Sequence, residues 1–117
     1  MKSIDLCNLI CEAIDEKKGY DIVKIAVTKL TTLCDYFIVA SGNSTANVKA
    51  ISEHLEEKLS KNEIEVKRME GQSEGRWIAM DYGDVIVHIF NDETRHFYHL
   101  ENFWEKGVHT KFEPKDK

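Results

Sequence analysis

Apolar residues recur at three- and four-residue steps in three stretches of the chain, which is the spacing of amphipathic helices. The first stretch covers residues 3–18, with Ser3 as the expected N-cap and Gly19 as the expected stop. The second stretch covers about 45–60 and the third about 93–105. The pattern therefore predicts three helices, each with one buried side.

The segments between these helices are rich in β-branched and aromatic residues, and they predict five strands at 22–27, 36–40, 64–69, 77–81 and 85–90. The run 36–40 is continuously apolar, which suits a central strand buried on both faces. The last two runs flank Tyr82-Gly83, a tight turn that predicts a β-hairpin. The order of elements predicts an α/β (α+β) fold, with helices packed on a mixed sheet of about five strands.

The chain has 117 residues, the size of one ordinary domain, and shows no internal repeat, linker or break in composition. We expect a single domain over 1–107 and a polar tail over 108–117 that frays. The start carries an acid at Asp5, and no apolar run approaches the ~20 residues of a membrane span. We therefore expect neither a secretory signal nor a membrane segment, and a cytoplasmic location.

The net charge is −5, from 16 basic and 21 acidic residues. A chain that grips nucleic acid usually presents a basic face to the phosphates, so this balance argues against direct, sequence-specific nucleic-acid binding. It fits a basic partner, because opposite potentials steer encounter. The alternative is that modest acidity only aids solubility.

Three cysteines occur, and Cys7 and Cys11 would share one helix face while Cys34 stands alone. An odd number without a signal sequence suggests a reducing compartment. Zinc needs four ligands, usually from two separated pairs, and no second pair with ligand spacing follows. We interpret the cysteines as small apolar core residues.

His96 and His99 lie three apart on the last predicted helix, and His88 or Glu101 would be the third ligand of a metal site. No position fixes that third ligand, so an exposed helix face is the favoured interpretation. We expect no metal and no cofactor.

The sequence resembles the ribosomal silencing factor (RsfS/Iojap) family in four segments that follow the family's order: 34–42, 70–71 with Trp77, 81–90 and 95–104. The most specific are the D-Y-G-D-V-hydrophobic-V-H-hydrophobic-F hairpin and the R-x-F-Y-x-L-E-x-x-W helix. Together these segments span most of the chain.

The resemblance implies a nucleotidyltransferase-like domain without the catalytic carboxylates. It implies binding to large-subunit ribosomal protein number fourteen, on the face where the subunits join. A bound protein there would block joining of the small subunit and repress translation when nutrients are limiting. The resemblance also implies a role in ribosome assembly for organellar relatives, and a weak homodimer.

The residues themselves argue against catalysis. A nucleotidyltransferase needs a Gly-Ser turn and two carboxylates on one strand face to hold Mg²⁺. Residues 42–44 give at best a displaced Gly-Ser turn, and Asp81 and Asp84 lie three apart across a turn. Glu63 and Glu65 have the right spacing but precede a peripheral strand, where solvated edge residues are the favoured interpretation. A residual nucleotidyltransferase and a large-subunit assembly factor remain the alternative functions.

Candidate partner-binding residues lie on the hairpin and the last helix: Trp77, Asp81, Asp84, His88, Phe90, Tyr98 and Glu101. Aromatic side chains flanked by polar groups are typical of interface centres, and Trp77 is the best single anchor. Trp77 filling the core is an equally weighted alternative. The acids either meet basic groups of a partner or only cap turns, and Arg95 is expected to tie the last helix to Asp81 or Asp84.

Overall fold

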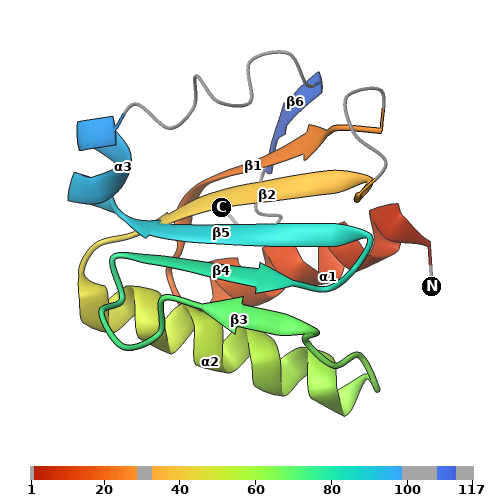
Figure 1. The fold of residues 1–117 in the computed structure, drawn as a ribbon, viewed down its shortest axis with the longest axis horizontal. Helices are drawn as coiled ribbons and strands as arrows, with labels where there is room; N and C mark the ends of the chain where they lie inside the picture. Colours follow the sequence, from red (N-terminus) through yellow and green to blue (C-terminus); the bar gives the residue numbers. More distant parts are fainter. Residues whose placement is uncertain (1, 29–32, 99–107, 113–117) are drawn as a thin grey trace.

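The computed structural model describes residues 2–28, 33–98 and 108–112 (Figure 1). The elements are α1 (Ser3–Glu16), β1 (Tyr20–Ala26), β2 (Tyr36–Gly42), α2 (Thr45–Lys61), β3 (Arg68–Glu70), β4 (Trp77–Asp81), β5 (Val85–Asn91), α3 (Asp92–Tyr98) and β6 (Val108–Lys111). Their order is the predicted one, with β6 added. None of the helices in these described ranges is long and apolar enough to cross a bilayer.

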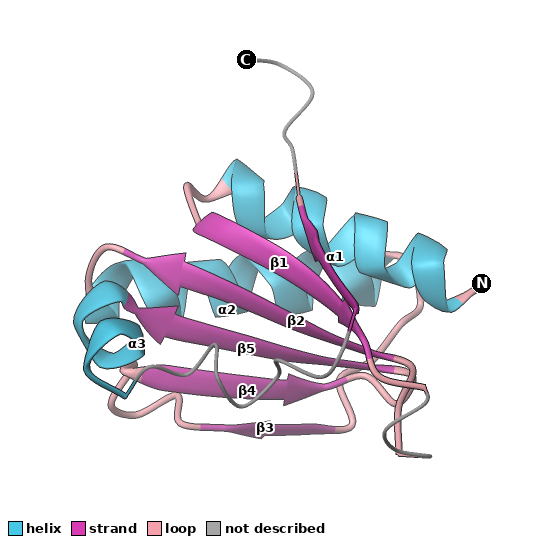
Figure 2. Cartoon of the chain, turned by 90° about the horizontal axis from the view of Figure 1, so that it is seen from above, coloured by secondary structure: helices cyan, strands magenta, loops and turns pink. Residues whose placement is uncertain are grey.

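The strands in the described residues form one mixed sheet in the order β3-β4-β5-β2-β1-β6. The central pair, β2 and β5, is parallel, and the other neighbouring pairs are antiparallel. Helices α1 and α2 lie together on one side of the sheet, and α3 lies at the end of β5 (Figures 1 and 2). The predicted class, an α+β domain with a mixed sheet and packed helices, is confirmed.

The main core lies between the sheet and the two long helices. Alternate residues of the central strands, such as Ile38 and Ile89, belong to one core cluster with Ile14 of α1 and with Ile51 and Leu55 of α2, and all five are fully buried. Burying each such side chain contributes about 1.5–3 kcal/mol of transfer free energy. The apolar faces that the helical period creates on α1 and α2 therefore pack against the apolar face that the two-residue period creates on the strands.

A second, smaller core lies on the other side of the sheet. It contains Ile25, Val27, Cys34, Val39 and Phe90, which are all buried. Strand β2 is therefore apolar on both faces, as its continuous run predicts.

The cysteines are core residues, as expected. All three are free and buried. Burial raises the pKa of the Cys7 and Cys11 thiols to about 12, so both stay protonated at neutral pH and are poor nucleophiles.

Two predicted boundaries are wrong. The strand expected over 64–69 is shortened to β3, because the backbone reverses after α2 with a left-handed residue at Glu63 (φ 62°). Ile64 then donates its N–H back to the Leu59 carbonyl. The tail does not fray at its start: β6 pairs antiparallel with β1, and Phe112 donates its N–H to the Ile22 carbonyl.

The start of α1 also differs from expectation. Lys2 holds the N-cap position and its side chain makes no capping bond. Ser3 instead donates its hydroxyl to the Asp35 carboxylate, which ties α1 to the segment before β2. The predicted extent of the last helix, 93–105, lies partly outside the described residues, which include α3 only to Tyr98.

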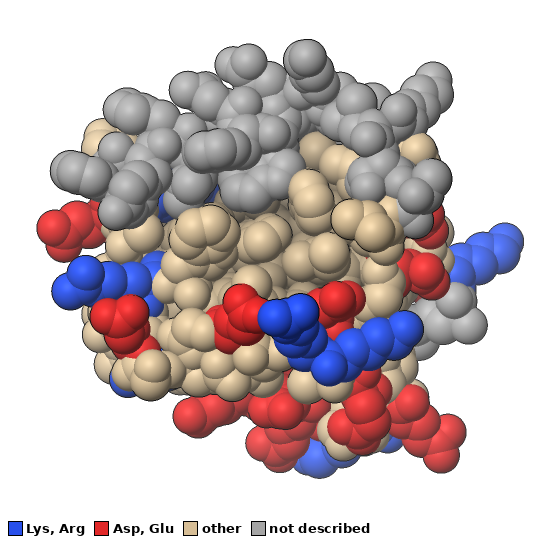
Figure 3. Space-filling view, in the orientation of Figure 1, with Lys and Arg blue, Asp and Glu red and all other residues tan. Residues whose placement is uncertain are grey.

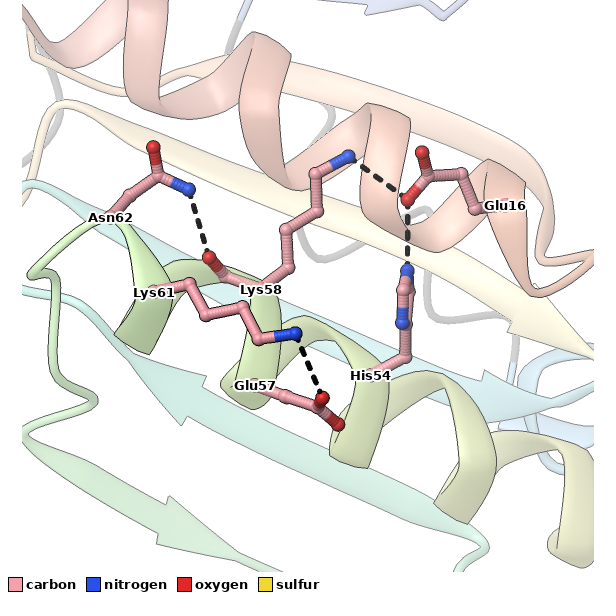
Figure 4. Close-up of polar contacts among 6 residues, drawn as sticks. All are labelled: Glu16, His54, Glu57, Lys58, Lys61 and Asn62. Carbon is pink, nitrogen blue, oxygen red and sulfur yellow. Dashed lines mark hydrogen bonds and ion pairs between the residues drawn. The ribbon is translucent and has the colours of Figure 1, made fainter.

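A polar bridge joins the outer sides of α1 and α2 (Figure 4). Glu16 at the end of α1 contacts His54 at 2.8 Å and Lys58 at 2.9 Å, both on α2. These two contacts hold the pKa of Glu16 below its usual range, the bond to His54 being the larger cause. Glu57 and Lys61 pair within α2 at 3.2 Å and connect no second element.

We predict that Glu16→Gln destabilises the fold by about 0.5 kcal/mol at pH 7, because the carboxylate is half exposed and solvent screens it. A lowered folded-state pKa gives stability that is present above the unfolded value, about 4.3, and is lost as pH falls through the folded value. Urea unfolding at pH 7 and at pH 3 should therefore show a smaller difference between mutant and wild type at pH 3.

Glu57→Gln is the matched control for this prediction, since its ion pair lies within one helix. It should change the urea midpoint less than Glu16→Gln does at pH 7. Equal effects of the two substitutions would show that the contact between the helices adds nothing.

Candidate functional site

The candidate site is the side of the β4–β5 hairpin that faces away from α1 and α2. We call it the hairpin face, and it consists of Trp77, Ala79, Asp81, Ile86, His88 and Phe90. The alternate residues, such as Ile78, Met80 and Val87, are fully buried in the main core. The two-residue period of the strands thus separates core residues from site residues. Figure 3 shows an uncharged tract in the middle of this side of the molecule, with acidic and basic side chains along the side of β3.

Trp77 opens β4 and is the large apolar side chain that this face exposes among the described residues, at 43%. Its cross-strand partner is Phe90, and the two ring centroids lie 4.9 Å apart with a tilt of 41°. The indole Nε1–H donates to Nδ1 of His88 at 3.0 Å. Trp77 is therefore partly exposed and held by two neighbours, the geometry of an interface anchor.

His88 lies at the centre of the hairpin face. Its ring also contacts Phe37 of β2, edge to face, with centroids 5.6 Å apart. Burial lowers the pKa of His88 to about 4, so the imidazole is neutral at neutral pH. Phe37 was not among the residues predicted for the site. Because Phe37 precedes Ile38 on the strand, the sequence could show that the two side chains point to opposite faces. Only the β2–β5 pairing, however, places Phe37 beside His88.

The acidic residues lie at the turn end of the hairpin. Asp81 accepts the Gly83 N–H at 2.7 Å and so caps its own turn. The Asp84 side chain is exposed, while its carbonyl accepts N–H bonds from Asp35 and Tyr36. Asp84 thus offers a carboxylate to solvent, whereas Asp81 is partly occupied within the fold.

The remaining predicted site residues divide into three cases. Phe90 has no exposed surface, so its side chain supports Trp77 and is not itself a contact for a partner in this structure. Tyr98 ends α3, and its side chain lies outside the described part of the structure. Glu101 lies outside the described residues altogether.

Arg95 does not tie α3 to the acids of the hairpin turn, as the sequence suggested. It is buried, and its guanidinium donates to the Asp21 carbonyl and the Ser41 hydroxyl. Ser41 pairs with Phe90, whereas Asp81 pairs with Ile86. Phe90 and Ile86 lie four residues apart on β5, so Ser41 and Asp81 are separated along the strand by about 13 Å, at ~3.3 Å per residue. Arg95 therefore fixes α3 to β1 and β2.

The positions weighed for catalysis have structural roles or lie on the surface. Glu63 and Glu65 are exposed in the loop before β3, not on one strand face. Ser44 of the displaced Gly-Ser turn caps α2, accepting the Asn47 N–H at 3.0 Å. His96 is exposed on α3, and His99 lies outside the described residues. Within the described ranges, no three His, Cys, Asp or Glu residues lie close enough to hold a metal ion.

Gly71 sets the path of the chain into Trp77. Its φ is +90°, and a Cβ added there would lie 2.0 Å from the Trp77 carbonyl oxygen. The Gly71 carbonyl also accepts the Gly75 N–H at 3.0 Å, which closes the loop between β3 and β4. Only glycine permits this approach of the two backbones.

The whole chain, residues 1–117, matches the family model described as "Ribosomal silencing factor during starvation". The ribosomal silencing factor RsfS of Bacillus subtilis is 36% identical over 104 residues, which cover 89% of this chain and 88% of the relative. A crystal structure of a protein from Chromobacterium violaceum superposes with a TM-score of 0.86 at 32% identity, covering 100% of this chain and 98% of the other. The mouse "Mitochondrial assembly of ribosomal large subunit protein 1" is 27% identical, and the match covers 83% of this chain but only 44% of that protein.

We predict that Gly71→Ala destabilises the protein by at least about 1 kcal/mol more than Gly83→Ala does. Both glycines have a φ near +90°, so the backbone strain is shared. They differ in what a Cβ meets: a backbone carbonyl at Gly71, but the flexible end of Lys67 at Gly83. Urea unfolding of both variants measures the difference. Equal losses of stability in the two variants would mean that the clash with the Trp77 carbonyl adds nothing to the cost of the substitution.

Proposed function

This chain belongs to the ribosomal silencing factor family, and we propose that it silences translation by binding the large ribosomal subunit and keeping the small subunit away. The proposed contact is large-subunit ribosomal protein number fourteen, and the proposed occasion is nutrient limitation. The family match over the full chain carries this proposal. The family is named for silencing, a regulatory role and not a catalytic one, in line with the sequence analysis.

The hairpin face is the proposed contact surface. It presents the Trp77 indole, 43% exposed, beside the partly buried His88 and Ile86. Tryptophan is enriched at the centres of interfaces, where water is excluded and most of the binding energy arises. A standard interface needs about 800 Å² from each partner, which a domain of this size can supply.

Charge supports a basic partner. The chain carries a net charge of −5, and the exposed Asp84 carboxylate lies at one end of the hairpin face. Acids at the rim of an interface raise the association rate and make it depend on salt. Binding should therefore weaken as salt increases, mainly through slower association.

The proposed mechanism is occlusion and involves no covalent chemistry. A domain fixed on the face where the subunits join needs only bulk and affinity, since two bodies cannot occupy one volume. We further propose that the protein acts in the cytoplasm, where free large subunits are present. The weak homodimer implied by the resemblance stays a prediction.

We predict that Trp77→Ala weakens binding to purified large subunits by about 30-fold, equivalent to ~2 kcal/mol for a central anchor. Ile4→Ala is the matched control, since Ile4 is 40% exposed but belongs to α1 in the helical layer. Binding is measured by co-sedimentation at two salt concentrations, with circular dichroism to show that both variants fold.

Wild-type binding that is lost in Trp77→Ala and kept in Ile4→Ala would support the hairpin face as the interface. Absence of wild-type binding would overturn the ribosome proposal. Binding kept in Trp77→Ala would place the interface elsewhere, and equal losses in both variants would show that the loss is not specific to the hairpin face.

A second candidate function is assistance in assembling the large subunit. The observation that favours it is the mouse relative, whose name describes mitochondrial assembly of the ribosomal large subunit. Both functions would use one docking surface on the same particle. The structure of the free chain is therefore compatible with either of them.

Ribosome profiles of a strain lacking the gene separate these two functions. Silencing predicts normal subunits during growth, together with excess joined ribosomes and continued translation in starvation. Assembly predicts precursor large particles during growth in rich medium. Sucrose-gradient sedimentation of both cultures measures the difference, and precursor particles in rich medium would make assembly the primary function.

A further inference from the structure

The indole of Trp77 is partly exposed and contacts two neighbours that fix its orientation. Phe90, fully buried, lies against one side of it as the direct cross-strand neighbour. His88, the diagonal neighbour on β5, accepts its N–H. Diagonal pairs in an antiparallel sheet lie within reach only of long or aromatic side chains, a condition that this pair meets.

The hydrogen bond requires one form of the imidazole. Nδ1 accepts a bond only when it carries no proton, so His88 is in the neutral form with its proton on Nε2. Burial, which lowers the pKa of His88 to about 4, keeps that neutral form at neutral pH. In a protonated imidazolium Nδ1 also carries a hydrogen, so it could not accept the hydrogen bond from the indole N–H.

The surrounding residues fit this arrangement. Ala79, which has a small side chain, lies directly opposite His88 in the register. On the other side, Phe37 contacts the imidazole edge to face, and the Phe90 ring lies nearly parallel to it with an interplanar angle of 13°. Three strands, β2, β4 and β5, thus contribute to placing one indole.

We propose that His88 is a positioning residue that fixes the Trp77 indole in its binding orientation, so that the partner receives it in an apolar pocket through its carbon edge. The indole N–H is already used inside the fold, and the partner therefore needs no acceptor for it. This inference rests on the proposed function, because it concerns the same surface and the same large-subunit partner.

Fixing the indole before binding reduces the entropy that association costs. An exposed side chain that is mobile before binding loses conformational freedom when it becomes immobilised at an interface. A tryptophan that is already immobile avoids much of that loss. His88 thereby affects affinity without touching the partner itself.

The test compares His88→Phe with His88→Asn in binding to purified large subunits. Phenylalanine keeps a ring but removes the acceptor, whereas the Asn side-chain oxygen lies close to where Nδ1 was. We expect roughly 10-fold weaker binding for His88→Phe, since each tenfold equals ~1.4 kcal/mol, and a loss within about 3-fold for His88→Asn. The indole N–H signal in a ¹H–¹⁵N spectrum, assigned with Trp77→Phe, reports the hydrogen bond independently of ribosomes. It should shift and exchange faster with water in His88→Phe only.

Trp77→Phe tests the apolar pocket, since it keeps an aromatic ring and loses the N–H. We expect it to bind within about 5-fold of wild type and far better than Trp77→Ala. A loss as large as that of Trp77→Ala would show that the partner needs the indole N–H or the full indole, and would overturn the apolar-pocket part.

The outcomes separate the two proposals. If wild-type protein does not bind large subunits, the proposed function fails, while the indole signal still shows whether His88 holds Trp77. If wild type binds and His88→Phe binds equally well, or His88→Asn is as weak as His88→Phe, the positioning role is overturned. Should His88→Phe not fold, the comparison of His88→Asn with wild type decides, and a tenfold loss there would equally overturn it.

Discussion

The parallel pairing of β2 with β5 is the contact on which the rest of the structure depends. It joins two seven-residue strands in unbroken register from Tyr36↔Val85 to Gly42↔Asn91. Parallel neighbours need a long crossover, and here that crossover contains α2, β3 and β4. The pairing therefore sets where α2 covers the sheet and places the hairpin beside β2, so both cores and the candidate site follow from it.

The two sides of the sheet are covered differently. Helices bury one side, and the hairpin part of the other side is left partly exposed, which is where we propose that the partner binds. On one side α1 and α2 bury alternate residues of each central strand, and the Glu16 bridge joins the two helices at the outside. On the other side the hairpin face keeps Trp77 partly exposed over a base of buried Phe90. A rigid sheet with a helical backing is a suitable base for a binding anchor, because strand positions are less mobile than loops. Binding by occlusion needs no more than such a surface and the bulk of the domain.

A few residues adopt unfavourable backbone conformations or bury polar groups in this arrangement. Gly71 adopts a positive φ so that the loop before β4 can pass close to the Trp77 carbonyl. The pKa of His88 is lowered well below neutral pH, because burial disfavours the charged form of its side chain. Arg95 is buried to anchor α3 through the Asp21 carbonyl and Ser41.

The sequence by itself determined the elements up to α3, their order and the hairpin, because helical and strand periods and the Tyr82-Gly83 turn are local properties of the chain. It also singled out Trp77 and His88 as candidate site residues, and the family resemblance supplied the function. Only the tertiary structure decided which side of the hairpin the helices cover and which side is left as the candidate site, since both sides carry apolar residues: Ile78 and Met80 on one, Trp77 and Phe90 on the other. Periodicity gives two faces but cannot say which one the helices cover. For the same reason the buried state of Phe90, the approach of Phe37 from β2 and the pairing of β6 with β1 became visible only in the fold, where residues distant in sequence meet.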